Sequence, residues 1–269
     1  MERLLRIPAF FLLIAVLAAC TRTDRDDRAA WEALTLTGEG DVFYPEMVEE
    51  LPEPARRFLL HAISPGTPLA RSVELEMRGQ MFLEPDSDPL PIRAEQILAP
   101  PHGFVWRARV TEGFMRISGY DRYLDGEGAM LWRLLGVFPV VRAAGADVTR
   151  SAAGRLAMEG VLIPSSLVPG SGVVWEEVDA DRARYRMAVD GEEVEVTVEV
   201  DPRGRPVRVS AMRWSDQVGP GYDLFVVELA GELESGGYRI PSDIEAGWRL
   251  GADDEFRFFR ATLSAAVFR

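Results

Sequence analysis

The chain contains no lysine and no asparagine, and among its 269 residues it has a single cysteine and two histidines. Without lysine, Schiff-base catalysis, serine–lysine dyads and a phosphate-loop lysine are all excluded. Without asparagine there is no acceptor for N-linked glycosylation. One cysteine cannot form an intramolecular disulfide or a paired-cysteine metal site. The sequence also lacks HExxH, GxSxG and CxxC motifs and a glycine-rich phosphate loop, so the common hydrolase, nucleotide-binding and redox signatures are missing.

Positive charge is also scarce, because 30 arginines face 43 acidic residues and the formal net charge is −13. Nucleic-acid binding requires a basic footprint, so we expect no nucleic-acid partner. Two imidazoles and one thiol supply too few soft ligands for a transition-metal site, so we expect no metal and no cofactor. What is present is 47% hydrophobic residues, enough for a large core that needs no disulfide to fold.

The N-terminal segment has the features of an export signal. Arg3 and Arg6 precede an apolar run over Ile7–Ala19, which is shorter than the ~20 residues of a membrane-spanning helix and typical of a signal-peptide core. Small residues then come directly before Cys20, which is the pattern of a lipobox. We therefore predict a lipoprotein signal peptide over residues 1–19 and lipidation of Cys20. The alternative is an ordinary signal peptide with a cysteine near its cleavage site.

The residues after Cys20 predict where the chain is held. Thr21 follows the cysteine, in place of the aspartate that retains lipoproteins in an inner membrane. In a cell with two membranes this favours the outer one, with the protein facing the periplasm. The next stretch, TRTDRDDRAA, is polar and charged and predicts a tether. We expect a lipidated N-terminus and tether over residues 20–50 and a single domain over residues 51–269.

The hydrophobic pattern within that domain changes period. Residues 51–63 have the proline-rich start and apolar stripe of a helix, and a second helix is predicted around Leu156. Elsewhere a period of two predicts strands, and Asp190-Gly191 predicts a tight hairpin turn that pairs Tyr185 with Val196 and Arg186 with Glu195. A dozen or so strands with two helices predict an α+β, mainly β fold. This would be a curved antiparallel sheet or incomplete β-barrel with helices covering its concave face.

The apolar middle of the chain suggests a binding site. A sheet covered by two short helices can leave an apolar cavity among the large side chains near the second helix. Taken one at a time, each of these side chains is more simply explained as part of a core. The candidate pocket residues are Phe104, Trp106, Trp132, Leu134, Phe138 and Leu156.

Several segments resemble a known group of proteins. They include Leu51-Pro-Glu-Pro-Ala-Arg-Arg-Phe58, Ala99-Pro-Pro-His-Gly-Phe-Val-Trp106, Leu134-Leu-Gly-Val-Phe-Pro-Val-Val141 and Ile163-Pro-Ser-Ser-Leu-Val-Pro169. Together they resemble an uncharacterised bacterial domain-of-unknown-function family, which implies no catalytic residues. The layout is also similar to Lol-type lipoprotein carriers and related lipid-binding lipoproteins, which implies a half-barrel with helices over an apolar cavity.

Three functions are consistent with these patterns. The first is a membrane-anchored lipoprotein that binds or transfers a lipid or other apolar ligand without catalysis. The second is a structural or interaction lipoprotein of the cell envelope with a filled core. The third is an acid–base hydrolase that uses carboxylates such as Asp125 and Glu127, which requires two of them to converge across a cleft. The patterns assign no function to His61 or His102.

Overall fold

A computed structural model describes residues 27–85, 87–112, 115–215 and 220–269. Cys20 and the predicted signal peptide lie outside the described residues. The helical elements are η1 (Pro45–Val48), α2 (Glu53–Ala62), α3 (Ala146–Met158), η2 (Glu159–Leu162) and η3 (Pro164–Leu167). The strands are β1 (Val73–Met81), β2 (Leu90–Ala99), β3 (Gly103–Glu112), β4 (Met115–Leu124), β5 (Glu127–Leu134), β6 (Phe138–Ala144), β7 (Val174–Glu177), β8 (Arg182–Val189), β9 (Glu192–Val200), β10 (Pro206–Ser215), β11 (Gly221–Ala230), β12 (Leu233–Ser235), β13 (Tyr238–Ile240), β14 (Asp243–Trp248) and β15 (Phe256–Phe268).

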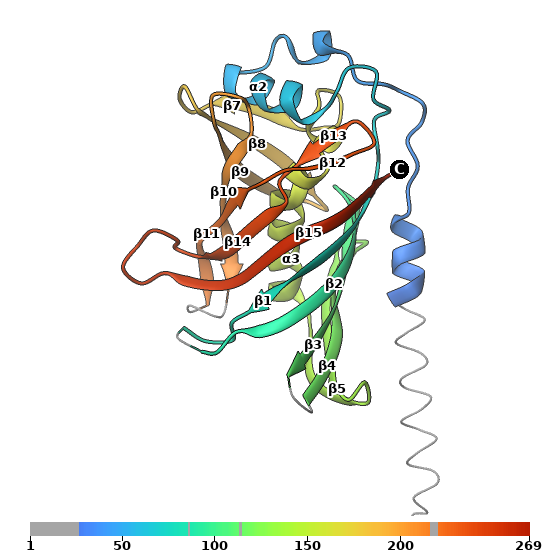
Figure 1. The fold of residues 1–269 in the computed structure, drawn as a ribbon, viewed down its shortest axis with the longest axis vertical. Coiled ribbons are helices and arrows are strands. Elements are labelled where there is room, and N and C mark those ends of the chain that lie inside the picture. The colour runs from blue at the N-terminus through green and yellow to red at the C-terminus, as the bar shows by residue number, and fades with distance from the viewer. Residues whose placement is uncertain (1–26, 86, 113–114, 216–219) are drawn as a thin grey trace, which may run out of the picture.

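Within the described residues, 13 of these strands form one antiparallel sheet in the order β6-β5-β4-β3-β2-β1-β15-β14-β11-β10-β9-β8-β7. The sheet curls into a half-barrel with two arms (Figure 1). Strand β15 joins the arms, because it pairs with β1 on one side and β14 on the other. The mainly β half-barrel predicted from the sequence is therefore confirmed.

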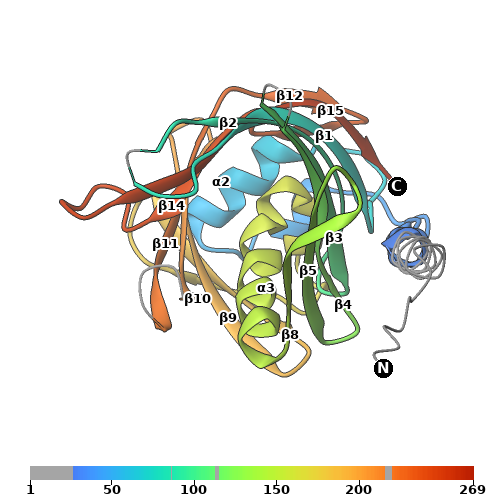
Figure 2. The same cartoon turned by 90° about the horizontal axis from the view of Figure 1, so that it is seen from below.

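Two helices cover the concave side, as the sequence predicts. Helix α3 crosses the space between the arms and contacts β4 and β5 on one side and β8, β9 and β10 on the other. Seen along the barrel, it lies within the curve of the sheet (Figure 2). Helix α2 contacts β8, β9 and β13 through a buried stripe at helical spacing formed by Ala55, Phe58, Leu59 and Ala62. Most of the core lies between these helices and the sheet.

The hairpin of β8 and β9 has the predicted register. Asp190 and Gly191 both have positive φ, 46° and 90°, as a two-residue type I′ turn requires. Tyr185 lies opposite Val196, and Arg186 lies opposite Glu195. The ion pairs differ from this simple facing pattern, because Arg186 pairs with Glu176 on β7 and Glu195 pairs with Arg184. The turn and the buried face therefore set the register. The charged side chains are flexible and form ion pairs with diagonal neighbours on the adjacent strand, two positions from the residue directly opposite.

A further helical segment, residues 27–34, packs on the convex face of the sheet. Its Ala30 and Leu34 are buried against Ile97 and Val105 of β2 and β3 in a small second cluster. Trp31 lies under the guanidinium group of Arg107, 4.4 Å from its ring centre. In the described part of the chain, no helix has the length and apolar character needed to cross a membrane.

Candidate functional site

The wall of the half-barrel opens between β9 and β10. These strands pair from Val200 and Pro206 as far as Thr197 and Ser210, where the pairing stops. Strand β9 begins five residues before Thr197 and β10 continues five residues past Ser210, so both strands extend beyond their last pair. Edge strands with unpaired backbone groups accept other partners. The two strands therefore stop pairing with each other part of the way along the wall.

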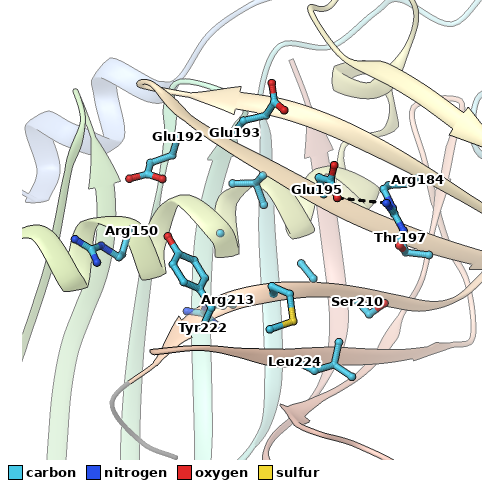
Figure 3. A pocket seen from close by; sticks show the side chains of 14 residues that line it. Arg150, Arg184, Glu192, Glu193, Glu195, Thr197, Ser210, Arg213, Tyr222 and Leu224 are labelled. Carbon is cyan, nitrogen blue, oxygen red and sulfur yellow. Dashed lines mark hydrogen bonds and ion pairs between the residues drawn. The ribbon is translucent and has the colours of Figure 1, made fainter. Parts of the chain in front are cut away.

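A cleft of about 350 Å³ occupies this split, which we call the lateral cleft (Figure 3). Because side chains alternate along a strand, Ser210 and Met212 point to one face of β10 and Ala211 and Arg213 to the other. All four line the cleft, so it passes through the wall and reaches α3. Its lining is Arg150, Gly154, Arg184, Glu192, Glu193, Val194, Glu195, Thr197, Ser210, Ala211, Met212, Arg213, Tyr222 and Leu224.

The lining of the lateral cleft carries both signs of charge, with three arginines and three glutamates. Arg150 lies over the Trp214 ring at 4.4 Å and pairs with Asp147 at 3.6 Å. Arg184 pairs with Glu195 at 3.3 Å. Between the charges lie Val194, Met212 and Leu224, so the surface has charged and apolar parts. Met212 and Leu224 lie directly opposite each other on β10 and β11.

Arg213 is the deepest of these arginines. Its Nε donates to the Ser151 carbonyl of α3 at 2.9 Å, and its guanidinium group lies 4.7 Å from the Phe225 ring centre. Burial, with a smaller contribution from Arg155, lowers the pKa of Arg213 to about 10. The group therefore stays charged at neutral pH. Gly154 allows this approach, because a side-chain carbon there would lie 3.2 Å from Arg213 Cγ.

A second polar cluster lies under α3 on the side of the other arm, and we call it the Arg155 network. Arg155 donates to Glu159 at 2.8 Å, to Asp121 at 3.4 Å and to the side-chain oxygen of Gln96 at 3.3 Å. The Gln96 amide donates to Glu159 at 2.5 Å, and Trp132 Nε1 donates to Asp121 at 3.0 Å. The network thus joins α3 and its C-terminal turn to β2, β4 and β5.

Burial raises the pKa of Asp121, and the nearby guanidinium group of Arg155 opposes that shift. Two carboxylates, Asp121 and Glu159, do converge here, but both are engaged by Arg155. Among the described residues, no group of three or more His, Cys, Asp or Glu side chains is arranged to hold a metal ion. The shared guanidinium group of Arg155 therefore ties α3 and its C-terminal turn to the sheet.

The predicted pocket residues lie away from the lateral cleft. Phe104, Trp106, Trp132 and Leu156 are buried in the main core, where the Trp106 and Trp132 ring centres are 5.7 Å apart. Leu134 is half-buried near the end of β5, and Phe138 is 61% exposed on β6. The structure thus brings four of the six together and leaves Phe138 apart. Their part in binding stays a prediction.

The other residues singled out in the sequence lie outside both polar sites. Asp125 and Glu127 are exposed at the turn between β4 and β5. His61 of α2 lies within hydrogen-bonding distance of Glu232, with Nε2 2.5 Å from the carboxylate. His102 is exposed, and its backbone N–H donates to the Ala99 carbonyl in the turn before β3. None of these four residues lines the lateral cleft.

Sequence reasoning missed the Arg155 network and the lateral cleft. The signal for the network was available, because period two places Gln96 and Asp121 on the same faces as the core residues Leu98 and Tyr123. An inward carboxylate on a strand needs a buried partner. The cleft had no such signal, since nothing in the composition of β9 or β10 marks where their pairing ends.

Comparison with known proteins gives one family and several structures. A family model described as a family of unknown function (DUF6544) matches residues 41–261. No curated protein matches the chain. Among solved structures, the chain is similar to a LolA superfamily protein from Nitrosomonas europaea, with 11% identity, a TM-score of 0.44 and coverage of 80% of this chain and 92% of that one. It is also similar to a DUF1329 family protein from Desulfovibrio piger, with 10% identity, a TM-score of 0.35 and coverage of 74% and 86%.

Proposed function

The chain belongs to the DUF6544 family of unknown function, and from its own residues we propose that it is a bacterial lipoprotein that binds or transfers a lipid. In this proposal Cys20 carries the anchor, the protein faces the periplasm from the outer membrane, and no catalysis is involved. The observation that carries the binding function is the lateral cleft. Its volume of about 350 Å³ falls within the range of small-molecule sites.

The lining of the cleft favours a ligand with an apolar chain and a zwitterionic head group. Val194, Met212 and Leu224 offer apolar contact, and a chain laid on them would remove hydrocarbon from water. Arg150 and Arg184 suit a phosphate, which arginine binds through paired hydrogen bonds. The three glutamates on β9 suit an ammonium group. A single-chain phospholipid has all three parts.

The first prediction concerns the charged rim of the lateral cleft. We expect Arg150→Gln/Arg184→Gln to weaken binding of dodecylphosphocholine about tenfold or more, because each lost hydrogen bond to a charged group is worth about 1.5–3 kcal/mol. Binding of dodecyl maltoside, which has the same alkyl chain and an uncharged head, should change little. The measurement is calorimetric titration of a chain starting at residue 21, below the micelle concentration of each detergent.

Two further variants make this test decisive. Ser210→Trp should block both ligands, because it places a large ring in the cleft from the outer face. Arg56→Gln/Arg203→Gln removes the same charge from exposed positions that do not line the cleft and should leave both affinities unchanged. If the wild-type chain binds neither detergent, the envelope scaffold with a filled core becomes the better account.

The second prediction concerns the anchor. Cells grown with an alkyne-bearing fatty acid should label the wild-type protein, and Cys20→Ser should abolish the label because the sequence holds no other thiol. Labelling is read after detergent extraction and coupling to a dye. As a control, Thr21→Ser changes the neighbouring residue and should stay fully labelled. An unlabelled wild-type protein would contradict the lipoprotein proposal but would not bear on ligand binding in the lateral cleft.

A further inference from the structure

The convex face of the first arm carries an unusual line of arginines. Arg78, Arg93 and Arg109 lie directly opposite one another on β1, β2 and β3. Ser118 of β4 and then Arg133 of β5 continue the same line. Neighbouring strands are about 4.8 Å apart, so the four guanidinium groups project from one narrow band. We call this band the arginine row.

Among the described residues, three of the four arginines in the row are left out of the ion pairs of this face, in which Glu95 pairs with Arg107. Arg78, Arg93 and Arg109 are exposed, and within the described part of the chain none of them forms an ion pair with an acidic side chain. Like charges directly opposite each other across strands are destabilising. The row therefore weakens the isolated domain, and an anionic partner would relieve that repulsion.

This concentration of arginine contrasts with the rest of the chain. Residues 90–144 contain seven arginines and five acidic residues, whereas the whole chain has a formal net charge of −13. Charge segregated in this way produces a local field that attracts anions even to an acidic protein. This face is therefore electrostatically suited to an anionic partner.

Next to the arginine row lies an exposed apolar surface formed by the turn between β5 and β6 together with β6, at the lower end of the molecule in Figure 1. Soluble monomers rarely expose large side chains side by side in this number. Arg133 of the row lies opposite Pro139 of this strand, so the charged and apolar surfaces are continuous. The apolar hairpin comprises Leu135 (57% exposed), Val137 (38%), Phe138 (61%), Val140 (52%) and Val141 (42%).

From this juxtaposition we propose that the arginine row and the apolar hairpin together form a docking surface for an anionic lipid bilayer. The arginines lie against the head groups while the hairpin enters the boundary with the acyl chains, as in interfacial membrane-binding segments. A second copy of the chain fits less well. Strand β6 is a sheet edge, and Pro139 removes a backbone donor that strand pairing would need.

The described part of the chain begins on the same face as the arginine row. Asp27 binds Arg107 at 2.8 Å, and Arg107 lies two residues from Arg109 on the outer face of β3. Seven residues separate the proposed anchor Cys20 from Asp27, and a segment of that length spans at most about 25 Å. This step rests on the proposed lipidation of Cys20, whereas the charge and exposure arguments do not.

The test places a fluorescent label in the hairpin of the mature chain, which in the proposal begins at residue 20. In a Cys20→Ser background, Val140→Cys provides the sole thiol, and the protein is mixed with phosphatidylcholine vesicles with or without 30% phosphatidylglycerol. Spin-labelled lipids then report contact of the label with the bilayer. We expect strong quenching in the anionic vesicles and weak quenching in the neutral ones. A label at Val174→Cys, an exposed position on the opposite sheet edge, should not be quenched.

Three variants assign the contact to the proposed residues. Arg93→Gln/Arg109→Gln should shift the equilibrium about 30-fold away from the docked state, because each arginine near an anionic surface contributes about a fivefold factor. Phe138→Ser should also reduce quenching, and Arg56→Gln/Arg203→Gln should leave it unchanged. Equal quenching in neutral and anionic vesicles, or no effect of the row variant, would overturn the proposal. A fluorescence change of the label that depends on protein concentration and not on lipid would also overturn the proposal, because it would indicate a dimer.

The outcome is independent of the lateral cleft. The row variant should bind dodecylphosphocholine as the wild type does, because none of its residues lines the cleft. The vesicle experiment also needs no lipid on Cys20. If the wild-type protein binds dodecylphosphocholine but does not dock on anionic vesicles, the result contradicts the docking surface and leaves the proposal for the lateral cleft standing.

Discussion

Replacing Trp106 by alanine is expected to lower the free energy of unfolding by about 3–5 kcal/mol, the range for removing a large aromatic side chain from a core. Trp106 is 3% exposed. Its ring packs against Trp132 and Phe259, with centres 5.7 and 6.0 Å away, and its indole N–H points at the Met77 sulfur. Chemical denaturation followed by circular dichroism measures the loss.

The same variant separates a core residue from a binding residue. Because Trp106 does not line the lateral cleft, the folded Trp106→Ala protein should bind dodecylphosphocholine with unchanged affinity. Trp106→Phe serves as the matched control, since it keeps an aromatic ring and should recover much of the stability. Weakened binding with little loss of stability would instead place the ligand among the core aromatics predicted from the sequence.

Replacing Arg155 by leucine is expected to cost about 3 kcal/mol at neutral pH. The change leaves Asp121 and Glu159 without their shared counter-charge, and breaking a fully buried pair costs about 3–5 kcal/mol. The lower part of that range applies because the three side chains keep about a fifth of their surface exposed. The guanidinium contact with the Phe104 ring, at 4.5 Å, is lost as well.

The pH dependence of this variant tests the assignment. Burial raises the pKa of Asp121 in the folded state, so its contribution to stability is greatest below its unfolded pKa and is lost as the pH rises through the folded value. Removing Arg155 raises that folded pKa further. The deficit of Arg155→Leu relative to wild type should therefore shrink near pH 4 and grow toward pH 7. Denaturation at a series of pH values measures it.

A double variant provides the control for this pH dependence. In Arg155→Leu/Asp121→Asn the unpaired charge is gone, while the amide oxygen can still accept from Trp132 Nε1. The growth of the deficit with pH should become smaller. If the double variant shows the same pH profile as Arg155→Leu, Asp121 is not the group whose ionisation destabilises the protein.

Local features of the fold were accessible from the sequence, and long-range ones were not. The Asp190-Gly191 turn fixed the register of β8 and β9 because both residues adopt positive φ, which that pair accommodates readily. The alternation of apolar and polar residues along β3 likewise predicts that Trp106 lies on the inner face of the sheet and Arg109 on the outer face. Nothing local indicates that β15 pairs with β1, since that pairing joins distant parts of the chain, whereas β14 and β15 are consecutive strands.

The candidate sites could be predicted only in part, because the sequence pattern assigns a residue to a face of the sheet but does not show what packs over that face. Periodicity placed Phe104 and Trp106 on the inner face, but whether an inner face is filled or hollow depends on which elements pack over it. The arginine row needed the register of five strands at once, because Arg78, Arg93, Arg109 and Arg133 fall on one line only after β1 to β5 have paired. Isolated arginines in a sequence carry no such information.

The position of β15 has a consequence for how the chain matures. Val73 at the start of β1 pairs with Phe268 near the end of β15, so the two arms cannot join until both of these strands have been synthesised. Most other neighbours in the sheet are consecutive strands, and such local pairings form faster than distant ones. In a nascent chain we therefore expect the hairpins of each arm to form first and the joining of β1 to β15 to come last.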